Sequence, residues 1–161
     1  MAKKRPTEAG FNESFEAAFA RLQVRLERAC LAEDPTDWPA QVAAAVREAL
    51  AFAAADPAAA RTLTTDALAQ GRDGFARYDR MIEYFGRWLL PGREVSPGID
   101  GESLPEITEK AMTGGLAMLI SNRVDQGRDS ELEALAPEAI RFVLTPYVGT
   151  AEARRAAADT G

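Results

Sequence analysis

The most numerous side chains able to do acid–base chemistry in this sequence are carboxylates, and many of them stand close to arginines. The chain has 25 Asp and Glu residues, 19 Lys and Arg residues and no histidine. It therefore lacks the commonest general base and the usual zinc ligand. Asp73 precedes Arg77 by four residues and Glu83 precedes Arg87 by four, which is the spacing of exposed ion pairs on a helix. We expect no catalytic site, no metal and no cofactor, and hence a protein that is not an enzyme.

The single cysteine, Cys30, has no second thiol with which to form a disulfide. It continues a series of apolar residues at helical spacing, Phe15, Phe19, Leu22 and Leu26, so we expect a buried thiol of the core and not a reactive one. The sequence shows neither a signal peptide nor an apolar run long enough to span a membrane. These features predict a cytoplasmic protein without membrane contact.

The charge balance argues against a nucleic-acid binder. The net charge is −6 and the pI is about 4.8, whereas a protein that binds the phosphate backbone needs a basic surface. The one basic cluster is Lys3, Lys4 and Arg5, and its position is typical of a solvated, frayed terminus. We expect no direct DNA binding by this chain.

The elements that position these side chains are predicted to be helices throughout. A chain of 161 residues suits one domain, and no window alternates apolar and polar residues in the way of a half-buried strand. The predicted fold class is therefore all-α. We expect a flexible segment over 1–10, a flexible tail over 154–161 and six helices between them. The first helix covers 12–31, and the second follows the break at 33–41 and ends at 55. The other four cover 57–70, 72–90, 104–126 and 137–148.

Local sequence signals mark the ends of several of these helices. Asp56 is placed to cap the third helix, and Pro57 stands in its first turn, where the missing N–H does no harm. Gly71 closes that helix, and Gly127 supplies a left-handed cap after the fifth.

The segment between the fourth and fifth helices is predicted to be a loop. Residues 91–103 contain two prolines and three glycines, which interrupt regular structure. Ser103 and Glu106 have the spacing of a capping box, so the fifth helix is expected to begin there.

The sixth helix, "APEAIRFVLTPYVG" (136–149), carries two apolar faces. At about 100° per residue, one face contains Ile140, Val143, Leu144 and Tyr147. The other lies about a third of a turn away and contains Leu135, Ala139, Phe142 and Pro146. Only Glu138, Arg141 and Thr145 share what remains. A helix at the edge of a monomer needs one buried face, so the second face predicts a partner.

The fifth helix supports the same prediction, because its centre, "AMTGGLAMLI", is apolar or small on every side. We expect a homodimer in which the last two helices of each subunit form a four-helix bundle. The predicted interface residues are Gly114, Gly115, Met118, Ile140, Val143, Leu144 and Tyr147. Two points stay open: the two glycines could instead accommodate a helix of the same subunit, and either face of the sixth helix could meet the partner.

The order of these segments resembles the C-terminal regulatory domain of TetR-family transcriptional regulators. The resemblance covers about residues 11–153. It starts with "FNESFEAAFARL", similar to the start of the family's connecting helix, and continues through "DPAAARTLTTDAL" and an aromatic-rich amphipathic helix. Its most specific part is the pattern "LxxLAPExxxFVLxPYxG", carried by Leu132, Leu135, Ala136, Pro137, Glu138, Phe142, Val143, Leu144, Pro146, Tyr147 and Gly149.

The resemblance implies a dimer bundle formed by the last two helices and a ligand cavity enclosed by the helices before them. The cavity would take a small hydrophobic or aromatic effector. The residues placed to line it are Val46, Leu50, Tyr78, Met81, Ile82, Phe85, Trp88, Met112 and Leu116, and plain core packing is the alternative for each of them. Tyr78 and Tyr84 would supply polar specificity.

One feature of the family is missing, because only residues 1–10 precede the connecting helix, where family members carry a helix-turn-helix head. The resemblance therefore implies the small-molecule-sensing and dimerisation domain of a TetR-like repressor, without direct DNA binding. Two alternatives remain at this point. One is a headless interaction protein that forms mixed dimers with full-length regulators, and the other is a small helical ligand carrier or enzyme.

Overall fold

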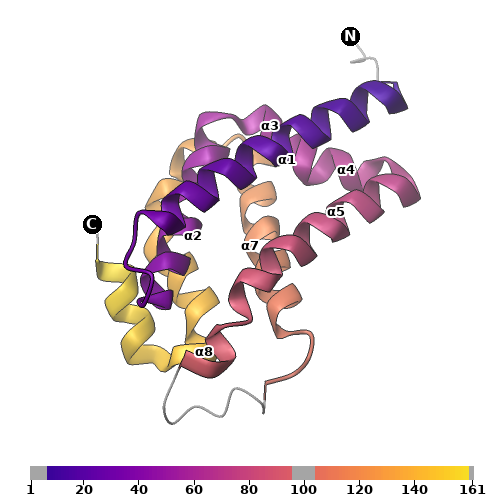
Figure 1. The fold of residues 1–161 in the computed structure, drawn as a ribbon. Coiled ribbons are helices and arrows are strands. Elements are labelled where there is room, and N and C mark those ends of the chain that lie inside the picture. Colours follow the sequence, from indigo (N-terminus) through magenta and orange to yellow (C-terminus); the bar gives the residue numbers. More distant parts are fainter. Residues whose placement is uncertain (1–6, 96–103, 160–161) are drawn as a thin grey trace.

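The structure is a computed structural model that describes residues 7–95 and 104–159. All regular elements in these two ranges are helices and neither range contains a strand, which confirms the all-α prediction. The longer helices are α1 (Glu8–Leu31), α2 (Trp38–Ala55), α5 (Gly71–Gly86), α7 (Thr108–Asp125) and α8 (Ala136–Ala158) (Figure 1). The shorter ones are α3 (Pro57–Leu63), α4 (Thr65–Ala69), α6 (Gly92–Val95) and the 3₁₀ turns η1 (Arg87–Leu89), η3 (Asp129–Glu131) and η4 (Glu133–Leu135). None of the helices described is long and apolar enough to cross a membrane.

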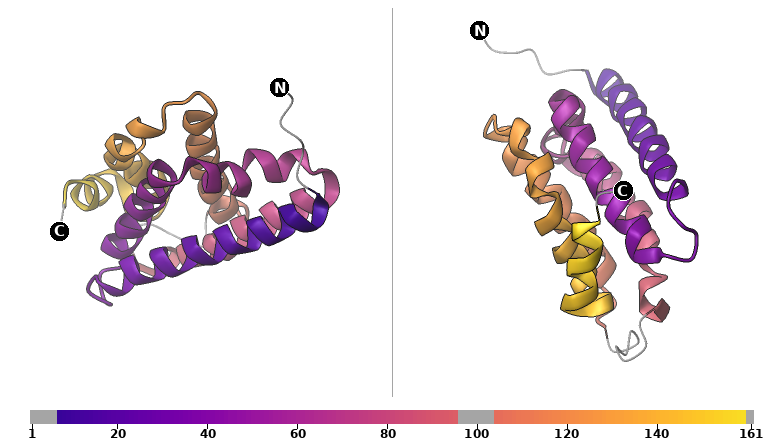
Figure 2. Two further views of the ribbon diagram at one scale, coloured as in Figure 1. Left: turned by 90° about the horizontal axis from the view of Figure 1, so that it is seen from above. Right: turned by 90° about the vertical axis from the view of Figure 1, so that its left-hand side faces the viewer.

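The first helix begins earlier than predicted, and α2 packs between it and α8 (Figure 2). α1 begins at Glu8 and not near Asn12, because the Thr7 hydroxyl oxygen accepts a hydrogen bond from the Gly10 amide at 3.3 Å. This cap satisfies one of the free amides of the first turn. Residues 8–10, expected to be flexible, are therefore helical.

The third helix starts as predicted but is divided in two. The Asp56 carboxylate accepts an amide hydrogen bond from the first turn of α3 at 3.0 Å, and Pro57 opens the helix. The single helix expected over 57–70 breaks at Thr64, whose φ of −121° and ψ of −93° are not helical. Gly71, predicted to close this helix, has a φ of 74° and lies between the end of α4 and the body of α5.

The helix predicted over 72–90 also changes along its length. It is α-helical as far as Gly86 and then tightens into η1. α6 occupies part of the loop predicted over 91–103, so that part of the prediction is wrong. Gly92 lies directly against the ring of Trp38, where a Cβ atom would come within 2.2 Å of it. Because this contact joins residues distant in sequence, local turn signals could not reveal it.

The start of α7 lies next to residues outside the described ranges. Ser103, the first member of the predicted capping box, is one of these. α7 begins at Thr108, four residues after the predicted start at 104, and the Thr108 hydroxyl donates a hydrogen bond to the Pro105 carbonyl oxygen at 2.7 Å. At the other end Gly127 has a φ of 68°, as predicted.

α8 consists of two helical stretches joined at Gly149, whose φ is 77° and ψ is 170°. The first stretch agrees with the sixth helix predicted over 137–148. The second continues to Ala158, and Ala156 and Ala157 are buried. Residues 154–158, expected to belong to a flexible tail, are thus part of the packed structure.

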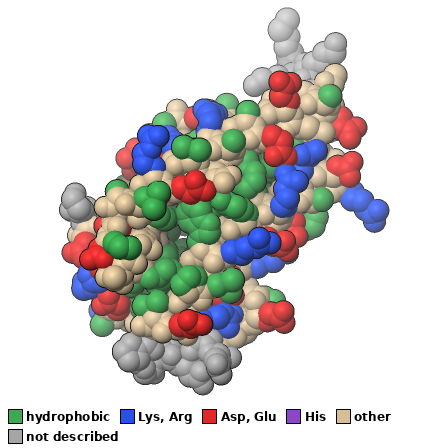
Figure 3. Space-filling model, in the orientation of Figure 1, with side chains coloured by type: hydrophobic (Ala, Val, Ile, Leu, Met, Phe, Trp, Pro, Cys, Tyr) green, Lys and Arg blue, Asp and Glu red, His purple; other side chains and the backbone are tan. Residues whose placement is uncertain are grey.

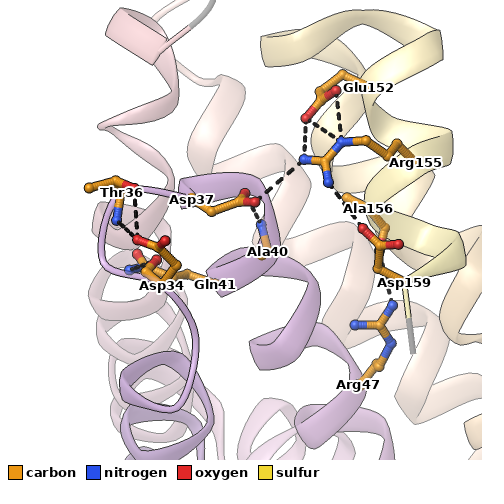
Figure 4. Close-up of polar contacts among 10 residues, drawn as sticks. All are labelled: Asp34, Thr36, Asp37, Ala40, Gln41, Arg47, Glu152, Arg155, Ala156 and Asp159. Carbon is orange, nitrogen blue, oxygen red and sulfur yellow. Dashed lines mark hydrogen bonds and ion pairs between the residues drawn. The ribbon is translucent and has the colours of Figure 1, made fainter. Parts of the chain in front are cut away.

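Polar contacts hold the end of α8 against α2 (Figure 4). The Arg155 guanidinium forms ion pairs with carboxylates of its own helix and lies 3.5 Å from Asp37 at the start of α2. The Arg47 guanidinium of α2 donates a hydrogen bond to the carbonyl oxygen of Ala156 at 2.9 Å. These contacts explain why the second stretch of α8 is ordered on α2.

Charged side chains of α5 form exposed ion pairs, as predicted, but their partners lie on other helices and not four residues away on α5. Arg77 pairs with Glu16 of α1 at 2.5 Å, and Glu83 lies 3.5 Å from the ammonium of Lys110 on α7. The spacing within one helix therefore identified the exposed charged surface and not the partners.

Two clusters of buried apolar side chains form the core. One lies mainly between α2 and α8 with the end of α7, and the other lies between α1, α3, α4 and α5. Ile140, Val143, Leu144 and Tyr147 belong to the first cluster and are at most 2% exposed. The prediction that these four side chains contact a partner subunit is therefore wrong, because α2 of the same subunit packs against their face of α8.

Candidate ligand-binding cavity

A cavity of about 480 Å³ opens between α1, α2, α3, α5 and α7. This volume lies in the range of small-molecule sites, which are typically apolar with a few polar groups. The space-filling view shows hydrophobic side chains gathered in a hollow on the face where α1 and α5 lie (Figure 3). The polar or ionisable side chains of the lining are few: Glu27, Cys30, Gln41, Thr64 and Thr113, together with the indoles of Trp38 and Trp88.

Six of the nine residues predicted to line a cavity do so. They are Val46 on α2, Met81, Ile82 and Phe85 on α5, Trp88 on η1 and Leu116 on α7. They are brought together because α7 packs against both α5 and α2, so that the three helices line one space.

The other three predicted residues, Leu50, Tyr78 and Met112, do not line the cavity. Leu50 is fully buried in the cluster between α2 and α8, and Met112 packs against the same cluster. Tyr78 packs against the second cluster, one turn before Met81 along α5. Helical periodicity placed all three on apolar faces, but it could not say which part of a face meets a neighbour and which part meets open space.

The sequence analysis missed the contribution of α1 and α3. Leu22, Leu26, Glu27 and Cys30 line the cavity from α1, and Ala60 and Leu63 do so from α3. The α1 residues were recognisable as an apolar series. That series was assigned to the core, because core and cavity lining have the same spacing.

Cys30 is one of these residues, and the prediction of a buried core thiol needs correction. It is partly exposed and faces the cavity, and its Sγ donates a hydrogen bond to the Gln41 carbonyl oxygen at 3.5 Å. Burial, and then the negative charges of Glu27 and Glu33, raise the pKa of the Cys30 thiol to about 11. The thiol is therefore protonated at neutral pH and is a poor nucleophile, in line with the expectation that it is not reactive.

Four aromatic rings form one wall beside the cavity. Phe85 lies edge-on to Tyr84 at 5.1 Å between ring centroids, to Trp88 at 5.5 Å and to Phe19 of α1 at 5.7 Å. Such edge-to-face contacts favour one arrangement of the rings. These contacts hold Phe19 of α1 against the end of α5 beside the cavity.

Glu27 is the charged residue of the lining, and two neutral groups orient it. The Tyr84 hydroxyl donates a hydrogen bond to its Oε1 at 3.0 Å, and the Gln23 side-chain amide donates to the same oxygen at 3.0 Å. The tyrosine predicted to supply polar specificity together with Tyr78 thus contacts a carboxylate at the cavity and is not itself part of the lining.

A second polar cluster lies at the end of the molecule where α6, α7 and α8 meet. Glu109 is 7% exposed, and its carboxylate accepts hydrogen bonds from Arg93 at 2.7 and 2.9 Å and from the Tyr147 hydroxyl at 3.3 Å. Burial alone would raise the pKa of Glu109, but the hydrogen bonds and charge of Arg93 outweigh it and hold the pKa below its ordinary value. Burial and the charge of Glu109 raise the pKa of Tyr147.

Trp38 connects this cluster with the cavity. Its ring lines the cavity and lies edge-on to the ring of Tyr147 at 5.5 Å, while its indole N–H donates a hydrogen bond to the Trp88 carbonyl oxygen at 3.1 Å. Trp38 of α2 is thus in contact with the cavity, with η1 and with α8.

The remaining predicted interface residues, Gly114, Gly115 and Met118, lie on α7, where Gly115 is next to Phe142 of α8. Met118 is 63% exposed and Phe142 is 47% exposed. A Cβ atom at Gly114 would meet nothing within 4 Å, whereas one at Gly115 would lie 2.9 Å from the Phe142 ring. Gly115 thus accommodates a helix of its own subunit, which was the alternative considered for both glycines, and Gly114 is open.

The described residues contain no group of three or more Cys, Asp or Glu side chains placed to hold a metal ion. Comparisons of the chain with protein-family models, with curated proteins and with solved structures find no match.

Proposed function

We propose that this chain binds an apolar or aromatic small molecule in the cavity between α1, α2, α5 and α7. The observation that carries the proposal is the cavity itself: about 480 Å³ of space with an almost wholly apolar lining, in a domain of 161 residues. Protein interiors are otherwise closely packed, and unfilled apolar space lowers stability. A ligand that fills such a space would therefore stabilise the folded chain.

We further propose that the chain acts as the effector-binding and dimerisation domain of a TetR-like transcriptional regulator. The support is the resemblance in the order of segments and in the "LxxLAPExxxFVLxPYxG" pattern, together with the helical fold and a cavity lined mainly by helices that precede α7. The contact of Trp38 with Tyr147 offers a route from a bound effector to α8.

The proposed partner is a second copy of this chain, docked on the exposed apolar surface formed by Gly114, Met118 and Phe142. Met118 is 63% exposed on the helix that carries the open Gly114, and Phe142 is 47% exposed on α8, and exposed apolar surface of this kind can mark an interaction site. A two-fold dimer would bury the same surface of both subunits at once. This assignment replaces the face with Ile140 and Tyr147, which the subunit's own core encloses.

Ligand binding is tested by thermal unfolding in the presence of a library of apolar and aromatic compounds. A compound that binds only the folded chain raises Tm, since at one hundred times its Kd it adds about 2.7 kcal/mol to the free energy of unfolding. Leu116→Trp places an indole in the cavity and should remove this shift. Asn122→Trp, at an exposed position of the same helix, should retain it. The proposal fails if no compound raises Tm, or if both variants respond as the wild type does.

A further inference from the structure

The lining of the cavity contains a single type of charge. Glu27 is the one Asp, Glu, Lys or Arg residue in it, and the other hydrogen-bonding side chains, such as Gln41, Thr64 and Thr113, are neutral. An apolar ligand would need no charged group there. The presence of a carboxylate beside otherwise apolar walls therefore indicates which polar group a ligand of this cavity carries.

Among the described residues, no positively charged side chain neutralises Glu27. Its hydrogen-bond partners, Tyr84 and Gln23, are neutral and both donate to Oε1. In the part of the chain that the structure describes, no Lys or Arg nitrogen comes within ion-pair distance of it, whereas Glu16 and Glu48 nearby each contact an arginine. The carboxylate is thus held in place by hydrogen bonds and keeps its second oxygen for another donor.

The surroundings of Glu27 favour a cation for two further reasons. Tyr84 belongs to the aromatic wall and lies 6.1 Å from Trp88 between ring centroids, and the faces of such rings attract cations. The whole chain has a net charge of −6, which raises the local concentration of cations and lowers that of anions.

We infer that the ligand of this cavity is a lipophilic cation, with its apolar body between α2, α5 and α7 and its ammonium group at the Glu27 carboxylate. The inference rests on the proposed function, since it assumes that the cavity takes a ligand at all. An ammonium in this position donates a charge-assisted hydrogen bond to Glu27 while the carbon chain replaces water in the apolar space. A ligand with a carboxylate head would meet like charge instead.

The test compares three probes that share one alkyl chain and differ in the charge of the head group: octylammonium, octanol and octanoate. Their Kd values are measured by titration calorimetry on the wild-type chain. Octylammonium should bind at least about tenfold more tightly than octanol, the range expected for a hydrogen bond to a charged group, and octanoate should bind most weakly. Added salt should weaken octylammonium binding and leave octanol binding nearly unchanged.

Two variants test whether Glu27 causes the preference for octylammonium over octanol. Glu27→Gln keeps the size of the side chain and should bring the Kd of octylammonium close to that of octanol, with octanol binding retained. Glu13→Gln removes the same charge from an exposed position of α1, about 21 Å along the helix axis, and should leave both Kd values unchanged. If Glu27→Gln lowers stability, the comparison of probes and the salt dependence on the wild type still decide the question.

The outcomes separate this inference from the proposed function. Equal binding of octanol and octylammonium, tighter binding of octanoate, or equal effects of the two variants would overturn the cationic ligand while the cavity remained a ligand site. Failure of all three probes to bind would overturn both.

Discussion

At the scale of single residues, Glu109 shows how this fold keeps a charge away from water. Its carboxylate receives two hydrogen bonds from Arg93 and one from Tyr147, and Arg93 also donates to the carbonyl oxygens of Leu104 and Pro105 at 3.1 and 2.8 Å. These bonds tie the segment before α7 to α6 and α8. A buried charge is tolerated only when it is paired and hydrogen-bonded in this way.

Replacing Glu109 should therefore destabilise the chain in a pH-dependent manner. Since the pKa of Glu109 lies below its ordinary value of 4.5 in the folded chain, its ionised form favours folding at neutral pH. That contribution is lost as the pH falls from about 4.5 through the lower folded pKa. Glu109→Gln should lower the free energy of unfolding by about 2 kcal/mol at pH 7, and the difference from wild type should shrink in acid.

The measurement is urea unfolding of the wild type and the variant at neutral and acidic pH. Glu131→Gln is the control, because Glu131 pairs with Arg128 on the surface, where such pairs contribute about 0–1 kcal/mol. A loss for Glu109→Gln no larger than that of the control at neutral pH would show that the buried cluster does not stabilise the fold.

At the scale of elements, the kink of α8 depends on one glycine. Gly149 has a φ of 77° and a ψ of 170°, a backbone conformation essentially restricted to glycine. The kink turns the second stretch of α8 so that Ala153, Ala156 and Ala157 are buried. Arg155 and Asp37 then come together beside α2.

Gly149→Ala should lower the free energy of unfolding by about 1–3 kcal/mol, because an alanine is strained in this conformation. Gly114→Ala is the matched control: Gly114 lies within α7, and a Cβ there meets nothing within 4 Å of the same subunit. That substitution should stabilise the subunit by up to about 1 kcal/mol, as expected for replacing a helical glycine. Thermal and urea unfolding report both values, and an equal effect of the two substitutions would contradict the role assigned to Gly149.

The elements also show which parts of the fold the sequence could predict. Asp56, Pro57, Gly71 and Gly127 affect only the backbone within a few residues of themselves, and all four have the roles that their types predicted. α6 was not predictable in this way, because Gly92 is held by the ring of Trp38. Periodicity likewise identified the apolar helix faces that line the cavity. It wrongly assigned Leu50 and Met112 to the lining, because these two side chains pack in or against the cluster between α2 and α8.

At the scale of the whole molecule, the same limit explains the dimer prediction. The sequence showed two apolar faces on the sixth helix, and only the tertiary structure distinguishes them. The face with Val143 and Leu144 meets α2 inside the subunit, whereas on the other face Ala139 is buried and Phe142 is 47% exposed. The surplus of apolar surface was a sound observation, but it points to the second face as the one that a partner would cover.

Two glutamate substitutions separate these faces. Met118→Glu introduces a charge that water can solvate in the isolated subunit, so the subunit should remain folded. In a dimer the same charge would be buried without a partner, which costs several kcal/mol, roughly, and the protein should therefore sediment as a monomer at micromolar concentration. Val143→Glu buries the charge in the core of the subunit itself, where the wild-type side chain is 2% exposed, and should unfold or aggregate the chain. Circular dichroism and sedimentation velocity distinguish the two results. If the wild type is already monomeric at this concentration, or if Met118→Glu leaves a dimer unchanged, the exposed surface of α7 and α8 is not the contact between two copies.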